Sequence, residues 1–181
     1  MTDCVALLRG INVGRAKRIA MADLRRLVEG LGCGEARTVL NSGNVLFRAS
    51  RPNVRRIAAE MEGAIDRRFG FSAGVVVVTA DTLAAIVEEN PLLHVAANPA
   101  RLLVAFVASA AVLATARELA AAPWAPEAFA LGGDAAYLWC PNGVIGSKLA
   151  QCFGRIAGDG ATTRNWATVL KVHAALAERR G

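Results

Sequence analysis

The sequence predicts an α+β protein made of two small domains in tandem. Three observations lead to this class. Strand-like and helix-like apolar patterns alternate along the 181 residues, and no apolar run reaches the roughly 18 residues that a membrane-spanning helix needs. The first eighty residues follow the order β-α-β-β-α-β, which is that of the ferredoxin-like unit. A similar pattern then begins again after a segment with the composition of a linker.

The first half contains every element of a ferredoxin-like unit, followed by one short helix. Its strands are indicated by β-branched and apolar runs, and its helices by apolar residues three and four positions apart. We expect Gly32 to end the first helix in a left-handed conformation, Ser50 to cap the second helix, and Thr79 or Asp81 to cap the third. The predicted elements are a central strand over 5–11, a helix over 21–31, a hairpin of 37–40 and 45–49 around the turn 41–44, a helix over 54–69, a strand over 74–79 and a short helix that ends before 90.

The second half repeats this order incompletely, as β-α-β-β-α-α. Thr162 or Thr163 is expected to cap the final helix, which contains Trp166. No repeat at the level of individual residues is visible, and we place the domain boundaries at 1–91 and 100–181. The predicted elements are a strand over 102–108, a helix over 112–120, a hairpin of 128–131 and 135–140, a short helix over 147–153 and the final helix through 176.

Composition limits the classes of function. A hydrophobic share of 54% supports a packed core and argues against global disorder. The four cysteines form no CxxC pair and stand at no metal-ligand spacing from the two histidines, so we expect reduced thiols, no metal site and no cofactor. The first residues lack the basic start of a signal peptide, which favours a cytoplasmic protein without membrane association.

The net charge is +6 and the pI is about 9.8. A basic balance is compatible with anionic partners such as nucleic acid or phosphorylated small molecules. The charges are spread along the chain, however, and an arginine-rich composition is the alternative explanation. The one compact cluster contains Arg15, Lys17 and Arg18, with Arg25 and Arg26 just beyond it.

No motif identifies a reaction. The chain has no GxSxG, no HExxH, no Walker A sequence and no GxGxxG after a strand. His94 falls in the linker and His173 on the apolar face of the last helix, which favours structural roles for both. The sequence therefore predicts no catalytic residue, and it leaves open whether the protein is an enzyme.

Two predicted helix starts are candidate anion sites. Ser147 and Lys148 stand where a strand passes into a helix, and the free N–H groups of a helix start attract anions. At the final helix, Thr163 is the expected cap and Asn165 lies in the first turn beside Arg164. Arg164 opposes the helix dipole there, so it could bind a carboxylate or phosphate bidentately. Ordinary caps and solvated cations are the alternatives.

Two further candidates lie in the first domain. Arg9 shares strand parity with buried residues, so we expect it to point toward the same side and either pair with an acid or line a site. Asn12 follows in the same glycine-containing loop. Ser42 and Asn44 belong to the hairpin turn, and the turn alone can explain them.

These four segments together resemble the signature stretches of the bacterial domain of unknown function family 1697. The sequence departs from the family pattern at Arg15, where a second glycine is usual, and at Ala167, where an asparagine is usual. The resemblance implies two α+β domains, the first ferredoxin-like, and no established reaction. The stretches are RGINVG (9–14), NSGNV (41–45), GSKL (146–149) and TTRNW followed by TV (162–166 and 168–169).

We therefore hypothesise that a small anionic ligand, phosphorylated or nucleotide-like, binds at a composite site between the domains. One alternative is a structural or partner-binding protein in which the same polar residues dock the domains. Another is RNA or DNA binding, although the predicted middle strand offers only Phe47 for base stacking. The sequence does not determine the oligomeric state. The predicted ligand-binding residues are Arg9, Asn12, Ser42, Asn44, Ser147, Lys148, Thr163, Arg164 and Asn165.

Overall fold

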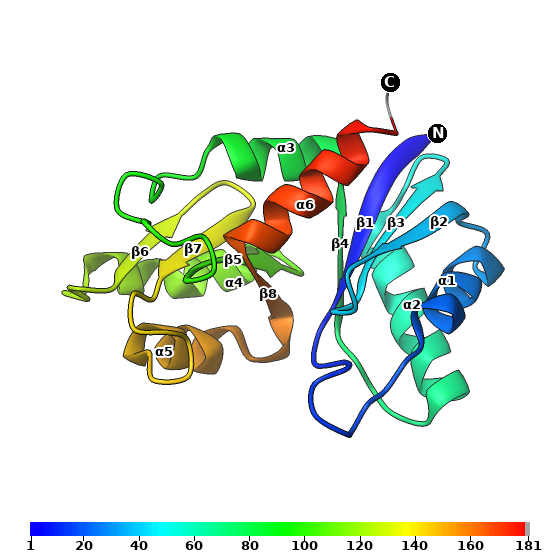
Figure 1. Ribbon diagram of the computed structural model, residues 1–181, viewed down its shortest axis with the longest axis horizontal. Coiled ribbons are helices and arrows are strands. Elements are labelled where there is room, and N and C mark those ends of the chain that lie inside the picture. The colour runs from blue at the N-terminus through cyan, green and yellow to red at the C-terminus, as the bar shows by residue number, and fades with distance from the viewer. Residues whose placement is uncertain (180–181) are drawn as a thin grey trace. The chain divides into compact units, whose positions relative to one another are not determined.

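The computed structural model describes residues 1–179, which form two compact units (Figure 1). The first unit comprises Met1–Leu83 and the end of the chain from Val172, and the second comprises Ala84–Lys171. The division departs from the predicted boundaries because the last helix begins in the second unit and ends in the first. The short helix near residue 83 is shared in the same way.

The first unit is the ferredoxin-like unit that the sequence predicts. Its four strands form one antiparallel sheet in the order β2-β3-β1-β4, with β1 central as expected. Both neighbours pair with β1, for example Ala6 with Val45 of β3 and with Val77 of β4. The elements are β1 (Thr2–Leu8), α1 (Met21–Gly30), β2 (Gly34–Val39), β3 (Asn44–Ala49), α2 (Val54–Phe69), β4 (Val75–Thr79) and α3 (Ala80–Glu88).

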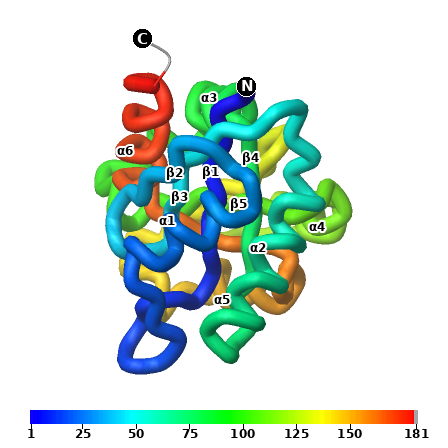
Figure 2. Tube along the Cα trace, turned by 90° about the vertical axis from the view of Figure 1, so that its right-hand side faces the viewer, coloured from blue at the N-terminus to red at the C-terminus, as the bar shows by residue number. Residues whose placement is uncertain are grey.

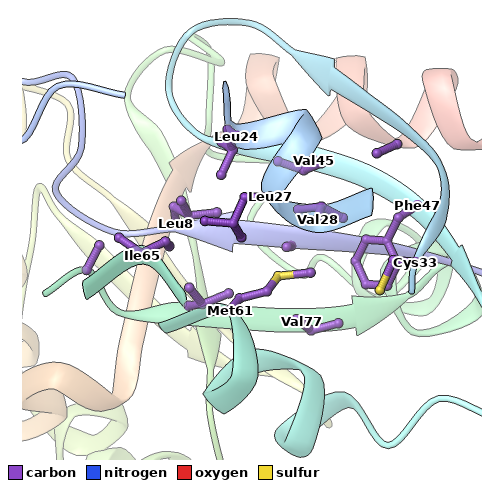
Figure 3. Packing of buried hydrophobic residues seen from close by; sticks show 14 of the residues in the cluster. Leu8, Leu24, Leu27, Val28, Cys33, Val45, Phe47, Met61, Ile65 and Val77 are labelled. Atoms are coloured by element: carbon purple, nitrogen blue, oxygen red, sulfur yellow. The ribbon is translucent and has the colours of Figure 1, made fainter. Parts of the chain in front are cut away.

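Helices α1 and α2 lie together on one face of this sheet (Figure 2). Leu24 and Leu27 of α1 and Met61 and Ile65 of α2 are buried against strand residues such as Phe47, which is fully buried (Figure 3). Each such side chain contributes roughly 1.5–3 kcal/mol by leaving water. The spacing of these residues in the sequence is what predicts both helices.

The helix ends agree with the sequence at two places and differ at a third. Gly32 follows α1 with φ 80°, in the left-handed region that we expect there. Thr79 caps α3, because its Oγ1 accepts a hydrogen bond from the Thr82 N–H at 3.1 Å. The expectation for Ser50 is wrong: the side chain of Asn53 caps α2 instead.

A cluster of four charged residues fixes the end of the chain to the first unit. Asp3 Oδ1 lies 3.1 Å from both Arg48 Nε and Arg179 Nε. The pair with Arg179 is an ion pair without an aligned hydrogen bond from Nε. Arg48 also donates to Glu35 Oε1 at 2.9 Å and to the Arg179 carbonyl at 2.9 Å. Strands β1, β2 and β3 thus all contribute to holding residue 179.

The second unit has the same strand order, β6-β7-β5-β8, with β5 central. The fold class predicted from the sequence is therefore confirmed. The chain passes through the same succession of strands and helices as in the first unit. The elements are β5 (Leu102–Val107), α4 (Ala110–Thr115), the 3-10 helix η1 (Ala116–Ala121), β6 (Ala128–Leu131), β7 (Ala135–Trp139), α5 (Lys148–Ala157), the 3-10 helix η2 (Gly158–Gly160), β8 (Ala161–Asn165) and α6 (Trp166–Ala177).

Strand β8 corrects the predicted order β-α-β-β-α-α. Its residues pair with β5, with Thr163 opposite Ala105, instead of opening a helix. The expectation that Thr162 or Thr163 caps the final helix is wrong for the same reason. Asn165 is the cap of α6, since its Oδ1 accepts a hydrogen bond from the Thr168 N–H at 2.9 Å. The second unit is therefore a full counterpart of the first.

Tyr137 fixes helix α3 within the second unit. It lies on β7, is completely buried, and donates its hydroxyl proton to the Ile86 carbonyl at 2.7 Å. Burial raises the pKa of Tyr137 to about 12, because the phenolate would lose its hydration. The opposite face of this sheet packs on α4, η1 and α5 through residues such as Leu138, Leu149 and Phe153.

Candidate functional site

The connection between β1 and α1 is far longer than the fold requires. It contains twelve residues, 9–20, whereas the equivalent connection between β5 and α4 contains only residues 108–109. Both units have the same strand order, so two residues suffice for this crossover. Most connections between a strand and a helix have roughly two to six residues, and longer ones are commonly functional. We call residues 9–20 the basic loop, for the charges described below.

Two buried isoleucines and one asparagine shape the basic loop. Ile11 and Ile19 are both buried, so the segment between them projects from the core. Asn12 has φ 56°, and its N–H donates to the Lys17 carbonyl at 3.0 Å. Its side chain accepts from the Ile19 N–H and donates to the carbonyls of Ile19 and Asn41, each at 3.0 Å. Asparagine tolerates a left-handed backbone better than most residues, so Asn12 suits both tasks.

The basic loop is also fixed to the connection between α2 and β4. The Lys17 ammonium group donates to the Ser72 carbonyl at 3.0 Å. The Arg9 N–H donates to the Gly74 carbonyl at 2.8 Å. Together with the bond from Asn12 to residue 41, these contacts hold the loop at two neighbouring turns of the first unit.

All charged side chains of the basic loop are cations. Arg9, Arg15, Lys17 and Arg18 are all exposed, and the sequence has no acid between Asp3 and Asp23. Within residues 1–179, Arg15 and Arg18 contact no carboxylate. Their guanidinium groups are therefore available to an anion that arrives from solution.

The two units divide the charge unequally. Fifteen of the 21 Lys and Arg residues but only nine of the 15 Asp and Glu residues belong to the first unit, and the second unit has six of each. The whole excess of +6 thus lies in the first unit. The expectation that the charge is spread along the chain is therefore wrong at the level of the units. The first unit therefore has the more positive electrostatic field of the two.

Gly43 brings the β2–β3 turn against the start of the basic loop. Its φ is 82°, and a Cβ atom there would lie 2.8 Å from Ile11 Cδ1 and 2.9 Å from Leu8 Cβ. Its carbonyl accepts a hydrogen bond from the Leu8 N–H at 2.8 Å. Glycine is thus required both by the backbone conformation and by the close approach.

Asn44 and Ser42 stabilise the same turn. Asn44 is fully buried, and its Nδ2 donates to the Val39 carbonyl at 2.8 Å and to Ser42 Oγ at 3.0 Å. These bonds explain both residue types by local structure. A contact of either residue with a ligand stays a prediction.

The strand parity of Arg9 predicts that its side chain points toward a buried side of the sheet, and this expectation is wrong. Strand β1 ends at Leu8, so Arg9 lies outside it and is exposed. Gly10 has φ 69°, which turns the chain away from the strand direction. Because Ile11 is apolar, the sequence pattern predicts a strand that extends to residue 11, whereas β1 ends at Leu8.

Ser147 and Lys148 form the start of α5, where the protein itself supplies an anion. Ser147 Oγ accepts a hydrogen bond from the Ala150 N–H at 2.9 Å. Glu127 Oε2 accepts one from the Leu149 N–H at 3.1 Å. The carboxylate of Glu127 thus stands where the sequence predicts a ligand phosphate, and Lys148 is exposed. A ligand contact at Lys148 stays a prediction.

Arg164 lies on the edge strand β8 rather than in a helix. Its Nη1 donates to Thr162 Oγ1 at 3.1 Å and to the Thr163 carbonyl at 2.9 Å. Burial lowers the pKa of Arg164 to about 10. Thr163 is exposed, and Asn165 is the cap of α6.

The structure thus brings four of the predicted site residues together within the first unit, namely Arg9, Asn12, Ser42 and Asn44. The other five belong to the second unit. The predicted composite site joins residues of both units, and it stays a prediction. The sequence missed Glu127, because its partner is 22 positions away in the chain.

Residues 1–179 contain no group of three or more His, Cys, Asp or Glu side chains that could hold a metal ion. No helix of this part combines the length and the apolar character needed to cross a bilayer. Cys4, Cys33 and Cys140 are buried, and burial raises the pKa of Cys4 to about 11.

The profile of the family described as "Protein of unknown function (DUF1697)" matches residues 1–137. The chain belongs to the DUF1697 family. This confirms the resemblance found in the sequence, although the stretches at 146–149 and 162–169 lie beyond the matched residues. No reaction accompanies the DUF1697 description. A comparison with curated proteins finds no match.

The DUF1697 chain is also similar in structure to the conserved bacterial protein SP0830 from Streptococcus pneumoniae. The TM-score is 0.74 at 21% sequence identity, over 97% of this chain and 98% of that chain. At this identity the similarity shows the fold alone.

Proposed function

We propose that this protein binds an anionic, phosphate-containing ligand through the basic loop. The observation that carries the proposal is the set of exposed cations on residues 9–18 without any acid among them. Guanidinium groups bind phosphate oxygens in pairs of parallel hydrogen bonds, and an ammonium group adds a compact charge. Arg15, Lys17 and Arg18 are the proposed contacts.

The anchoring of the loop supports the same proposal. Asn12 and Lys17 fix the loop by hydrogen bonds to two neighbouring turns, so its backbone is ordered before a ligand arrives. Binding to a preordered loop loses less conformational entropy than binding to a mobile one. A left-handed backbone at both Asn12 and Lys17 fits a segment held in place for a function.

Four of the predicted site residues have a simpler role. Asn12, Asn44, Ser147 and Asn165 use their side chains to bond the backbone around them. This favours local structural roles, as caps and turn residues, for these four, and the direct ligand contacts are therefore assigned to the charged residues. The predicted contribution of Lys148 is tested separately, by Lys148→Gln.

The test measures the binding of pyrophosphate, ATP and inorganic polyphosphate by isothermal titration calorimetry. The variant Arg15→Gln/Arg18→Gln removes two cations of the loop. Its matched control is Arg51→Gln/Arg55→Gln, which removes two exposed cations from the opposite end of the first unit, where β3 passes into α2. Neither residue of the control pair contacts a carboxylate within residues 1–179.

We expect the loop variant to weaken binding at least tenfold and the control to change it less than twofold. Equal losses in both variants would mean that only the overall charge matters, and would refute a site on the loop. Absence of binding by the unchanged protein to all three anions would refute the proposed function itself.

A further inference from the structure

Two half-buried aromatic rings lie beside the basic loop. Phe69 ends α2 and Phe71 follows two residues later, with ring centroids 6.2 Å apart and planes 30° apart. Phe71 directly precedes Ser72, whose carbonyl accepts the hydrogen bond from Lys17. The rings and the loop therefore belong to one continuous surface at one end of the first unit.

Two more cations precede the rings in the chain. Arg67 and Arg68 form the last turn of α2, and both are exposed. The guanidinium carbon of Arg68 lies 5.7 Å from the centroid of the Phe69 ring. Asp23 neutralises part of this charge, since its Oδ1 is 3.5 Å from Arg68 Nη2. We call the surface that these residues share with the loop the basic end: Arg15, Lys17, Arg18, Arg67, Arg68, Phe69 and Phe71.

Cations alone would satisfy a simple phosphate, whereas rings beside cations match a ligand that also has flat apolar faces. Bases stack on aromatic side chains at roughly 1–3 kcal/mol per base, and this contact tolerates any sequence. A strand of nucleotides offers phosphates and bases in alternation. The basic end likewise contains both cations and aromatic rings.

The sheet itself offers no such platform. Phe47 of β3, the ring on the predicted middle strand, is completely buried under α1 and α2. The aromatic surface of the first unit therefore lies at the end of α2. Proteins that bind RNA on the strands of a sheet place their aromatic side chains on the sheet itself.

We propose that the basic end binds single-stranded nucleic acid, with its cations at the phosphates and Phe71 and Phe69 at the bases. The proposal rests on the proposed function and specifies its ligand class. Free nucleotides share this chemistry, so the experiment includes them as a separate arm.

The experiment measures fluorescence anisotropy of a labelled 12-nucleotide oligouridine, rU12, over a range of salt concentrations. Phe71→Leu removes the ring but keeps an apolar side chain against the core. The matched control is Phe129→Leu in the second unit, because Phe129 is also half-buried and also pairs with another phenylalanine, at 6.1 Å. Phe69→Leu replaces Phe71→Leu if the latter does not fold, and Phe71→Trp tests whether a different ring restores binding.

We expect Phe71→Leu to weaken rU12 binding about tenfold, while Phe71→Trp and Phe129→Leu bind like the unchanged protein. Binding of inorganic polyphosphate, which has no bases, should be the same in Phe71→Leu and in the unchanged protein. Removing two phosphate contacts by Arg15→Gln/Arg18→Gln should reduce the slope of log K against log salt by about 1.4, since each contact with a single strand contributes about 0.7.

Three results would overturn the nucleic-acid proposal and leave anion binding intact. These are equal effects of Phe71→Leu and Phe129→Leu, competition by polyphosphate as strong as that by rU12 at equal charge, and competition by uridine monophosphate as strong as that by rU12 per nucleotide. If neither rU12 nor polyphosphate binds, the proposed function fails as well.

Discussion

Thr79 and Asn165 occupy equivalent positions in the two units, and each joins the fourth strand of its sheet directly to a helix. Each is the last residue of its strand and accepts a hydrogen bond from the N–H three residues on, Thr82 at 3.1 Å and Thr168 at 2.9 Å. The equivalence extends the repeat that the two strand orders show. The equivalence of Thr79 and Asn165 becomes visible only when the strands and helices of the two units are compared in order.

The cap at Asn165 gives a direct test of the corrected end of β8. Asn165→Ala should lower the free energy of unfolding by about 1 kcal/mol, because the cap satisfies a free N–H of α6. Asn165→Asp should keep most of the stability. Thr163→Ala, at the cap position that the sequence predicts, should change it by less than about 0.5 kcal/mol. Urea denaturation measures all three, and a larger loss at Thr163 than at Asn165 would contradict the assignment.

Gly43→Ala should be among the most destabilising single changes in the first unit. A left-handed backbone costs a residue with a Cβ about 1–2 kcal/mol, and the overlap with Ile11 and Leu8 adds about 1–3 kcal/mol. Gly70→Ala is the control, since Gly70 also has a positive φ, 74°, but no atom within 4 Å of its added Cβ. Thermal unfolding should show a clearly larger loss at Gly43. Equal losses of stability in the two variants would mean that the neighbours of residue 43 accommodate the added Cβ without a loss of free energy.

Tyr137 is the only tyrosine of the chain, so its ionisation can be followed by phenolate absorbance. The folded-state pKa of about 12 lies above the ordinary value of 10.0. A raised pKa means that the folded state holds this proton more tightly. Its contribution to stability is therefore complete below pH 10 and is lost as the pH rises toward 12. The native protein should show almost no phenolate at pH 10, where the protein in guanidinium chloride is half ionised. A native midpoint near pH 10 would contradict the burial.

Asn12 should link the stability of the basic loop to ligand binding. Asn12→Gly keeps the left-handed backbone but removes three side-chain hydrogen bonds, which are worth about 1 kcal/mol each. We expect a loss of about 2–3 kcal/mol in stability and weaker binding of polyphosphate at unchanged net charge. The control is Asn53→Gly, which removes a cap at the other end of the unit. Unchanged polyphosphate affinity in Asn12→Gly would show that binding does not depend on loop order.

The sequence predicts those elements whose apolar residues face the hydrophobic core of their unit. Helices α1 and α2 bury one face each, and their periodicity marks them clearly. The sequence does not predict strand β8, and the reason is physical. Its residues Thr163 and Arg164 are partly or fully exposed at the edge of a sheet, so no apolar alternation marks them. The strand is formed by hydrogen bonds to β5, which lies more than fifty residues earlier in the chain.

The sequence predicts the residue types of the candidate site. It does not predict the residues with which they form hydrogen bonds. The cluster of Arg15, Lys17 and Arg18 is visible in the sequence because no acid interrupts it. The contact of Glu127 with the start of α5, and that of Lys17 with Ser72, join residues 22 and 55 positions apart. Contacts at such separations depend on the tertiary fold, and no local pattern contains them.

The position of Arg179 means that the first unit is discontinuous in sequence. Arg179 is nine-tenths buried and contacts β1 and β2, so a residue that follows the whole second unit in the chain completes the charge pairing of Asp3. A fragment limited to residues 1–83 would contain every strand of the first sheet but would leave Asp3 with Arg48 alone as its cation. The second unit is thus an insertion into the sequence of the first, and cutting the chain before residue 172 would weaken the charge cluster around Asp3.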